Sequence, residues 1–276
     1  MPEINIIDVK NIIKLVKQKY GFDPGIIDPA SLTLRLEKLM KNNNISDTDL
    51  LCQHLDQDPD FYKQFLYTLF SNESELFRDP EMWIYLRDQV IPRLIAEKKN
   101  IRILVCFCTS GSDLYSIRML VNELGLQKDT QLHYSWPSEL NHIIIWKGKL
   151  INSQLETSLE NMKKVIPGAD EKKYLVKKKK DYFFNSLFLK EITDEEYKFN
   201  THPGYRDYDL VIFRNQLLNF NHNYQNLMLH NLVKSLEKNG IMVLGYKENI
   251  VDYLVSHSTL VPENKKENIY RKVFNG

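Results

Sequence analysis

The sequence predicts an α/β protein in which a small all-helical N-terminal domain precedes a Rossmann-like domain with a mostly parallel, doubly wound sheet. Apolar residues recur at helical spacing through residues 4–75. From residue 101 the pattern changes to a continuous apolar run, which is typical of a strand buried on both faces of a parallel sheet. Further strand-like runs then alternate with helical stretches, and this order indicates a doubly wound sheet.

The composition excludes several classes of protein. The chain has 276 residues, of which 43% are hydrophobic and 26% charged, as in a soluble globular protein. The net charge of +1 gives no overall field that would draw the chain to nucleic acid or to a membrane. No apolar run reaches the roughly 18 residues of a membrane span, and the first residues lack a signal-peptide pattern. The three cysteines, an odd number, fit a reducing cytoplasm, so we expect a cytoplasmic protein.

The N-terminal domain is expected to span residues 1–78 and to hold four short helices. The first ends at Tyr20-Gly21, the second follows Pro29, and the fourth carries aromatic and leucine residues over 61–69. Ser46 and Asp49 resemble a capping arrangement for the third helix. A helix over residues 79–98 is expected to link the two domains, with a proline near its start, where the missing N–H costs little.

The second domain is expected to span residues 99–276. Its strands are predicted at 101–108, 131–136, 208–213, 241–246 and 269–274. The intervening helices are predicted at 114–124, 137–145 and 223–238, the last ending at Asn239-Gly240. The stretch around 147–207 is lysine-rich and irregular in pattern, and we expect an insertion there.

Three segments carry a resemblance to a known family. They are the run N-E-S-E-L-F-R-D-P at 72–80, the run I-L-V-C-F-C-T-S-G-S-D-L-Y-S at 103–116, and the run Y-D-L-V-I-F-R-N at 208–215. In content and order they resemble the N-E-T-x-F-F-R-D-P junction, the cofactor loop and the D-L-I-x-C-R-N strand of CheR-type chemotaxis receptor methyltransferases. The resemblance covers nearly the whole chain. It implies a Rossmann-like methyltransferase domain and an ancestral transfer of methyl groups from S-adenosylmethionine to glutamate side chains of chemoreceptors.

The resemblance also implies roles for individual residues. Arg78 stands at the family's active-site arginine. The positions implied to bind the cofactor are Asn72, Ser74, Gly111, Asp113, Leu187 and Arg214. We expect residues 72–80 to lie at the carboxyl ends of the strands, with Arg78 facing the loop at Gly111.

Four positions depart from the family pattern. Phe107 stands where the loop has a small residue, and its ring is placed to fill the adenosyl site. Ser112 stands at a glutamate that contacts the cofactor, and Ser135 at the acid that ends the second strand. A carboxylate there would accept hydrogen bonds from the ribose hydroxyls. Asn219 stands at the tyrosine expected beside the transferred methyl group. The sequence therefore indicates a degenerate member.

Three hypotheses follow. In the first, the chain is a weak or inactive relative that works through contacts with signalling proteins, with the cytoplasmic regions of chemoreceptors as candidates. In the second, it is an active methyltransferase with a rearranged pocket. In the third, it binds a different nucleotide-like ligand. The absent acid at Ser135 and the ring at Phe107 favour the first.

Other features have simpler interpretations. Cys106 and Cys108 are more typical of buried structural thiols than of a metal pair, and no metal site is expected. The lysines at 177–180 fit either an acidic-partner patch or, more commonly, a solvated loop. The charges of Arg35, Lys38 and Lys41 lie along one side of the second helix, either as a thin version of a receptor-binding helix or as ordinary surface.

Overall fold

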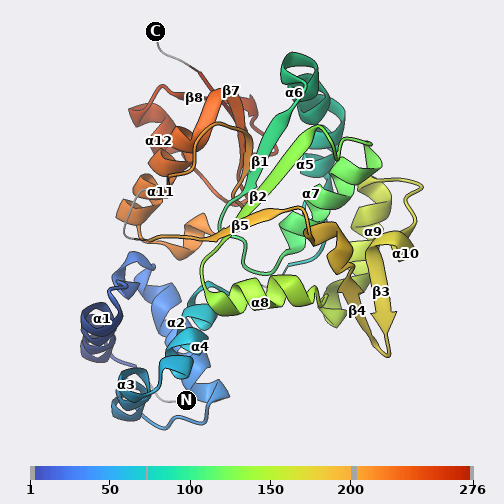
Figure 1. Ribbon diagram of the computed structural model, residues 1–276. Helices are drawn as coiled ribbons and strands as arrows, with labels where there is room; N and C mark the ends of the chain where they lie inside the picture. Colours follow the sequence, from blue (N-terminus) through green and yellow to red (C-terminus); the bar gives the residue numbers. More distant parts are fainter. Residues whose placement is uncertain (1–3, 73, 200–203, 274–276) are drawn as a thin grey trace.

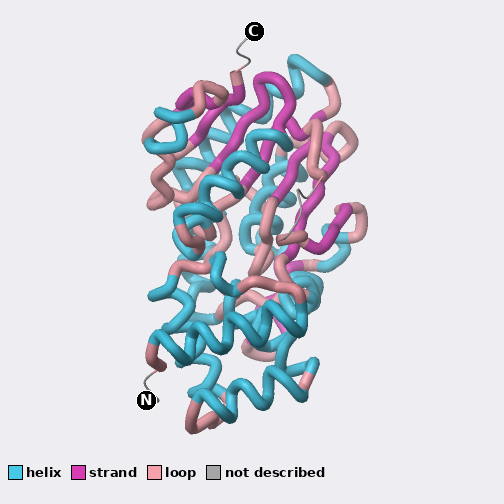
Figure 2. Tube along the Cα trace, turned by 90° about the vertical axis from the view of Figure 1, so that its left-hand side faces the viewer, coloured by secondary structure: helices cyan, strands magenta, loops and turns pink. Residues whose placement is uncertain are grey.

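A computed structural model describes residues 4–72, 74–199 and 204–273 of the chain. Four helices gather at the N-terminal end of the molecule, and a twisted sheet flanked by helices forms the larger part (Figures 1 and 2). This is the predicted fold class, a small all-helical domain followed by a methyltransferase fold with a mostly parallel sheet. Glu73 of the junction run and Phe274 at the end of the last expected strand lie outside the described residues.

The N-terminal helices begin at capping side chains. Their bounds are α1 Ile6–Tyr20, α2 Pro29–Asn42, α3 Thr48–Gln57 and α4 Pro59–Phe70. The cap of α3 corrects the predicted arrangement of Ser46 and Asp49. Asp47 is the N-cap, and its carboxylate accepts from the N–H of Leu50 at 2.9 Å while Ser46 donates to it at 2.7 Å.

The linking helix is continuous but not uniform. It comprises α5 Pro80–Tyr85, a π-helical segment Leu86–Val90, and α6 Ile91–Lys98. Pro92 has no N–H to donate to a carbonyl in the preceding turn, and the widened turn comes just before it.

The described residues form a seven-stranded sheet in the order β5-β2-β1-β6-β7-β9-β8. The parallel strands are β1 Ile101–Val105, β2 Thr130–Trp136, β5 Thr193–Glu196, β6 Tyr208–Ile212 and β7 Leu236–Val243. β8 Leu260–Asn264 and β9 Ile269–Lys272 complete the sheet in antiparallel pairing. The helices that accompany the strands are α7 Ser112–Glu123, α8 Glu139–Lys147, α11 His222–Ser235 and α12 Val251–Ser256. The chain runs from β1 outward to β5 and then from β6 outward to β7, so the direction of winding changes between β1 and β6.

Two expected elements are different in the structure. The stretch 147–207 is not merely irregular, because it holds α9 Leu155–Val165, α10 Glu171–Tyr174, the hairpin β3 Leu175–Lys178 and β4 Asp181–Phe184, and the edge strand β5. The exposed lysines at 177–180 form the end of that hairpin. The helix predicted over 223–238 stops at Ser235, because Leu236 pairs with Tyr208 at the start of β7.

The helical domain and the sheet share a hydrophobic core. One cluster of buried side chains joins Leu36 and Phe65 of the helical domain to Val211 and Met242 of the sheet. A second cluster fills the other face of the sheet beneath α7 and the linking helix. The helical domain thus packs over the carboxyl ends of β1 and β6.

Candidate functional site

A small cavity lies where the winding direction of the sheet changes. Its volume is about 30 Å³, and its walls come from the carboxyl ends of β1 and β6 and from the junction run. Ligands of doubly wound sheets bind at this kind of switch point. The lining residues are Asn72, Ser74, the segment 105–113 and Arg214, Asn215 and Gln216.

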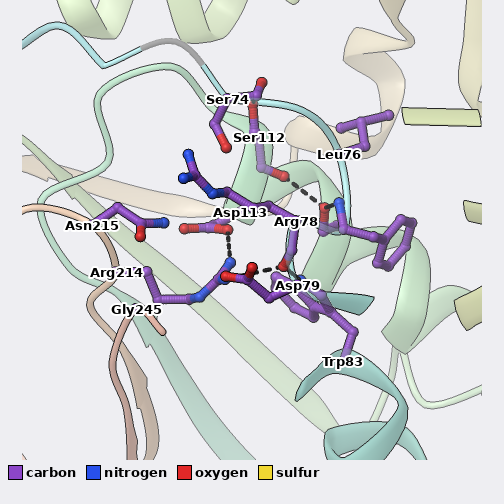
Figure 3. A network of polar contacts seen from close by, with 12 residues as sticks. Ser74, Leu76, Arg78, Asp79, Trp83, Ser112, Asp113, Arg214, Asn215 and Gly245 are labelled. Atoms are coloured by element: carbon purple, nitrogen blue, oxygen red, sulfur yellow. Dashed lines mark hydrogen bonds and ion pairs between the residues drawn. The ribbon is translucent and has the colours of Figure 1, made fainter. Parts of the chain in front are cut away.

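Arg214 is the centre of a polar network at the end of β6 (Figure 3). Its side chain is 1% exposed and donates to Asp113 at 2.8 Å and to Asp79 at 2.6 Å. It also donates to the carbonyl of Arg78 at 3.0 Å and lies 5.7 Å from the ring of Trp83. Two carboxylates therefore compensate one buried guanidinium, which is the condition for burying a charge without a large penalty.

The junction run lies along the loop that follows β1. Ser112 donates to the carbonyl of Ser74 at 2.6 Å, and the N–H of Phe77 donates to Ser116 at 2.8 Å. Asn72 donates to the carbonyl of Asn215 at 3.2 Å, which joins the run to the end of β6. In Figure 3 the Arg78 side chain points into the space between Ser74 and Asp113.

The backbone around this cavity is unusual. Phe77, Asp79, Phe107 and Asn215 have φ of +50°, +58°, +62° and +59°, a region that residues with a Cβ adopt only at a cost of about 1–2 kcal/mol each. Gly111 has φ +88°, and a Cβ there would lie 2.3 Å from the ring of Tyr115. Such strain collects at functional sites, and here it marks all three segments that form the cavity.

Phe107 is buried among aromatic rings on the β2 side of the switch point. The side chain is 1% exposed. Its ring centroid lies 5.2 Å from Phe70, 5.1 Å from Tyr197 and 5.5 Å from Phe220, with Phe199 and Phe213 at 5.7 and 6.3 Å. These rings come from α4, from the segment after β5 and from the segments after β6. The cluster fills the space above the end of β1 with hydrocarbon.

Ser135, at the end of β2, has a structural role. It is 0% exposed, and its hydroxyl accepts from the N–H of Phe107 at 3.0 Å. The next residue, Trp136, donates to Asp194 of β5 at 3.1 Å. Asp194 is a carboxylate beside β2 that the sequence analysis missed, because β5 itself has no apolar pattern.

Two further positions do not line the cavity, although Asn219 donates to the lining residue Gln216 at 3.1 Å. Leu187 is 63% exposed, on a short helix Ser186–Leu189 between β4 and β5, and is not among the residues that line the cavity. Asn219 accepts from Arg35 at 2.9 Å, and Arg35 also donates to the carbonyl of Thr68 at 3.0 Å. Arg35 therefore bridges the two domains, while Lys38 and Lys41 of the same helix are exposed.

In the described part of the chain, no three His, Cys, Asp or Glu side chains come together as a metal site would require. Burial raises the pKa of the Cys106 and Cys108 thiols to about 12, so neither is a ready nucleophile. No helix in the described ranges has the length and apolarity to cross a membrane.

Comparison with known proteins identifies the family. The family model for the CheR methyltransferase SAM-binding domain matches residues 72–263, and that for the CheR methyltransferase all-alpha domain matches residues 7–70. The chain belongs to the CheR methyltransferase family. The predicted resemblance is thereby confirmed.

Relatives match over most of their length. The chain is 25% identical to the Cher3 protein of Pseudomonas putida, over 96% of this chain and 97% of that protein. It is 22% identical to a chemotaxis protein methyltransferase of Listeria monocytogenes, over 87% of this chain and 88% of the relative. Among solved structures it is similar to the N-methyltransferase NodS from Bradyrhizobium japonicum in complex with S-adenosyl-L-homocysteine. That likeness has 10% identity and a TM-score of 0.36, and it covers 76% of this chain and 97% of NodS.

The family implies S-adenosylmethionine as cofactor, and the cavities at the switch point are small in this structure. The first measures about 30 Å³ and an adjoining one, which also touches Asn72, Ser74 and Ser112, about 90 Å³, whereas small-molecule sites measure roughly 300–1,000 Å³. The Phe107 ring is enclosed by its neighbours, and the Ser135 hydroxyl is committed to a backbone N–H. The polar residues around Arg214 are present. Aromatic rings fill the space around Phe107, beside β2.

Proposed function

We propose that this chain is a CheR-family protein that has lost binding of S-adenosylmethionine and acts through protein contacts in a signalling pathway. The observation that carries the proposal is the enclosure of Phe107 by five aromatic rings, directly above a fully buried Ser135. Removing rings from such a cluster costs several kcal/mol, so a ligand would have to offset that cost before it gained any contact.

The proposal also covers the cellular location of the protein and its binding partners. We infer a cytoplasmic protein whose partners are signalling proteins, with the cytoplasmic regions of chemoreceptors as candidates and no nucleic acid or inserted membrane segment. Residues 1–78 form the helical domain, 79–98 the linking helix, and 99–276 the methyltransferase-fold domain with an insertion around 147–207.

Calorimetric titration with S-adenosylhomocysteine tests the loss of binding. We expect no saturable heat at micromolar ligand, because aromatic rings surround Phe107, Ser135 stands where the family has an acid, and the Asp194 carboxylate beside β2 already accepts from Trp136. A dissociation constant of a few micromolar, or cofactor found bound after purification, would contradict the proposal.

A second candidate function is retained methyltransferase activity with a rearranged pocket. It is favoured by the polar half of the site, where Arg78 points between Ser74 and Asp113 and Arg214 is held by two carboxylates. In this reading Arg78 is catalytic, and the cofactor contacts come from Asn72, Ser74, Gly111, Asp113 and Arg214, with Leu187 brought in by movement of its exposed helix. Binding of S-adenosylhomocysteine by the wild-type protein separates this candidate from the first.

A variant designed to reopen the site sharpens that test. Phe107→Gly removes the ring, Ser135→Asp supplies a carboxylate, and Ser112→Glu supplies a second. We expect the folded triple variant to bind S-adenosylhomocysteine measurably and Phe107→Gly alone to bind less, because the steric and electrostatic terms act on one ligand and are not additive. A folded triple variant without binding would mean that the backbone itself has closed the site.

A further inference from the structure

A second cavity lies at the other end of β2, away from the switch point. Its volume is about 290 Å³, which is close to the lower limit of small-molecule sites, and it shares no lining residue with the first cavity. It opens between α7, the turn before β2, the first residues of β2 and the start of β5. Its lining residues are Arg118, Gln127, Lys128, Thr130, Gln131, Leu132, His133, Glu191 and Thr193.

Arg118 is a buried cation with an unused donor. It is 7% exposed, and its Nε is buried without a hydrogen-bond partner among the described residues. Its Nη2 lies 3.3 Å from Glu191, a carboxylate whose side chain is 79% exposed. Native proteins satisfy nearly all buried donors with protein, water or ligand groups, so the unpaired Nε of this cavity-lining residue can take a further acceptor, as can the unpaired Nε of Arg214 at the first cavity.

Thr130 gives the same indication independently. It is 8% exposed, and its Oγ1 is also buried without a partner in the described part of the chain. Two other polar side chains of the lining have partners of their own. Gln127 donates to the carbonyl of Asn122 at 3.1 Å, and the Nδ1 of His133 lies 2.8 Å from the Tyr208 hydroxyl. Burial and the nearby Arg102 lower the pKa of His133, so it is uncharged at neutral pH.

The charge balance of the cavity favours an anion. Arg118 and the exposed Lys128 are cationic, and the Glu191 carboxylate, on its exposed side chain, is the opposing charge. The edge of a guanidinium formed by Nε and Nη2 matches the two oxygens of a carboxylate, which it binds in a bidentate way. Glu191 occupies only one of those two donors, and its exposure makes it easy to displace.

We propose that this cavity binds a small organic carboxylate, which takes the guanidinium edge of Arg118 in place of Glu191 and accepts a hydrogen bond from Thr130. Glu191 then acts as an intramolecular competitor for the ligand. The carboxylate class follows from the geometry of the donor pair and from the side chain that already stands there. This inference is independent of the proposed loss of S-adenosylmethionine binding, since the two cavities have no residue in common.

Calorimetric titration of the full chain with succinate tests the proposal. We expect saturable binding by the wild-type protein and a loss of at least about tenfold in Arg118→Met, which keeps the aliphatic stem but removes a charged donor. Thr130→Val, which is nearly isosteric, is expected to weaken binding a few-fold, and Glu191→Gln to tighten it. Lys149→Gln, in the β3–β4 region beside Asp181, is the matched surface control and is expected to leave the affinity unchanged.

If Arg118→Met does not fold, the other two variants still test the proposal. Thr130→Val should lower the affinity for succinate, and Glu191→Gln should raise it. Absence of saturable binding at tens of millimolar succinate overturns it. So does equal binding in wild type and Glu191→Gln. Inorganic phosphate is titrated in parallel, and a phosphate affinity equal to that of succinate overturns the carboxylate assignment.

Discussion

The two sides of the switch point are stabilised by different kinds of interaction. On the β6 side a buried Arg214 joins Asp79 and Asp113, so the junction run, α7 and β6 meet through ion pairs. On the β2 side Phe107 and its aromatic neighbours meet through packing, and Ser135 accepts a hydrogen bond from the Phe107 N–H. The side that keeps the family's residues is thus also the side where those residues hold the junction run against the sheet. Their presence alone is therefore weak support for activity.

Loss of the Arg214 ion pairs on the β6 side is expected to have the largest effect on the free energy of unfolding. Arg214→Met leaves two partly buried carboxylates without their cation, so the free energy of unfolding should fall by about 3–5 kcal/mol in urea titrations. Arg206→Met removes an exposed arginine and should change it by less than about 0.5 kcal/mol. A loss below about 1 kcal/mol in Arg214→Met would show that the network contributes little net stability.

Removing the ring on the aromatic side comes next. Phe107→Ala should lower the free energy of unfolding by about 3–5 kcal/mol through lost packing. Phe107→Gly should be at least as stable as Phe107→Ala, because at φ +62° a residue with a Cβ carries about 1–2 kcal/mol of strain that glycine avoids. Glycine less stable than alanine in urea titrations would contradict the left-handed conformation at this position.

The hydrogen bond beneath the ring should matter less than the ring. Ser135→Ala removes the acceptor of the buried Phe107 N–H and is expected to cost about 1–3 kcal/mol in thermal or urea unfolding. Ser256→Ala, an exposed serine on α12, is the control and should stay within about 0.5 kcal/mol of wild type. Equal stability of both variants would mean that water reaches the Phe107 N–H.

The smallest expected effect concerns pH on the polar side. Glu248 is 1% exposed, and burial raises its pKa although it accepts from the N–H groups of Leu217 at 2.6 Å and Gly245 at 2.5 Å. Because its folded-state pKa is raised, the stability it contributes is present below its unfolded pKa and is lost as pH rises through the folded pKa. The stability of wild type relative to Glu248→Gln should therefore decrease from pH 4 to pH 7.5 in urea titrations. An increase over that interval would reverse the assigned direction.

Much of the fold was predictable because its elements are locally patterned. Apolar runs predicted the central strands of the sheet, and helical spacing predicted the N-terminal helices, although the N-cap of α3 was assigned to Ser46 and is Asp47. The strand β5 could not be predicted. Its sequence is Thr-Asp-Glu-Glu, and it is a strand only because it pairs with β2 at the edge of the sheet.

The order of the segments at the site, the glycine at 111 and the departures at Phe107 and Ser135 can all be read from the sequence. Each is a property of a single position within a motif that the family shares. The contacts between distant segments follow from the fold alone: rings from three segments surround Phe107, Arg35 bridges the domains to Asn219, and Arg118 lines a cavity beside β2. Local periodicity reports that a side chain is buried, whereas the identity of what covers it depends on contacts between residues far apart in the chain.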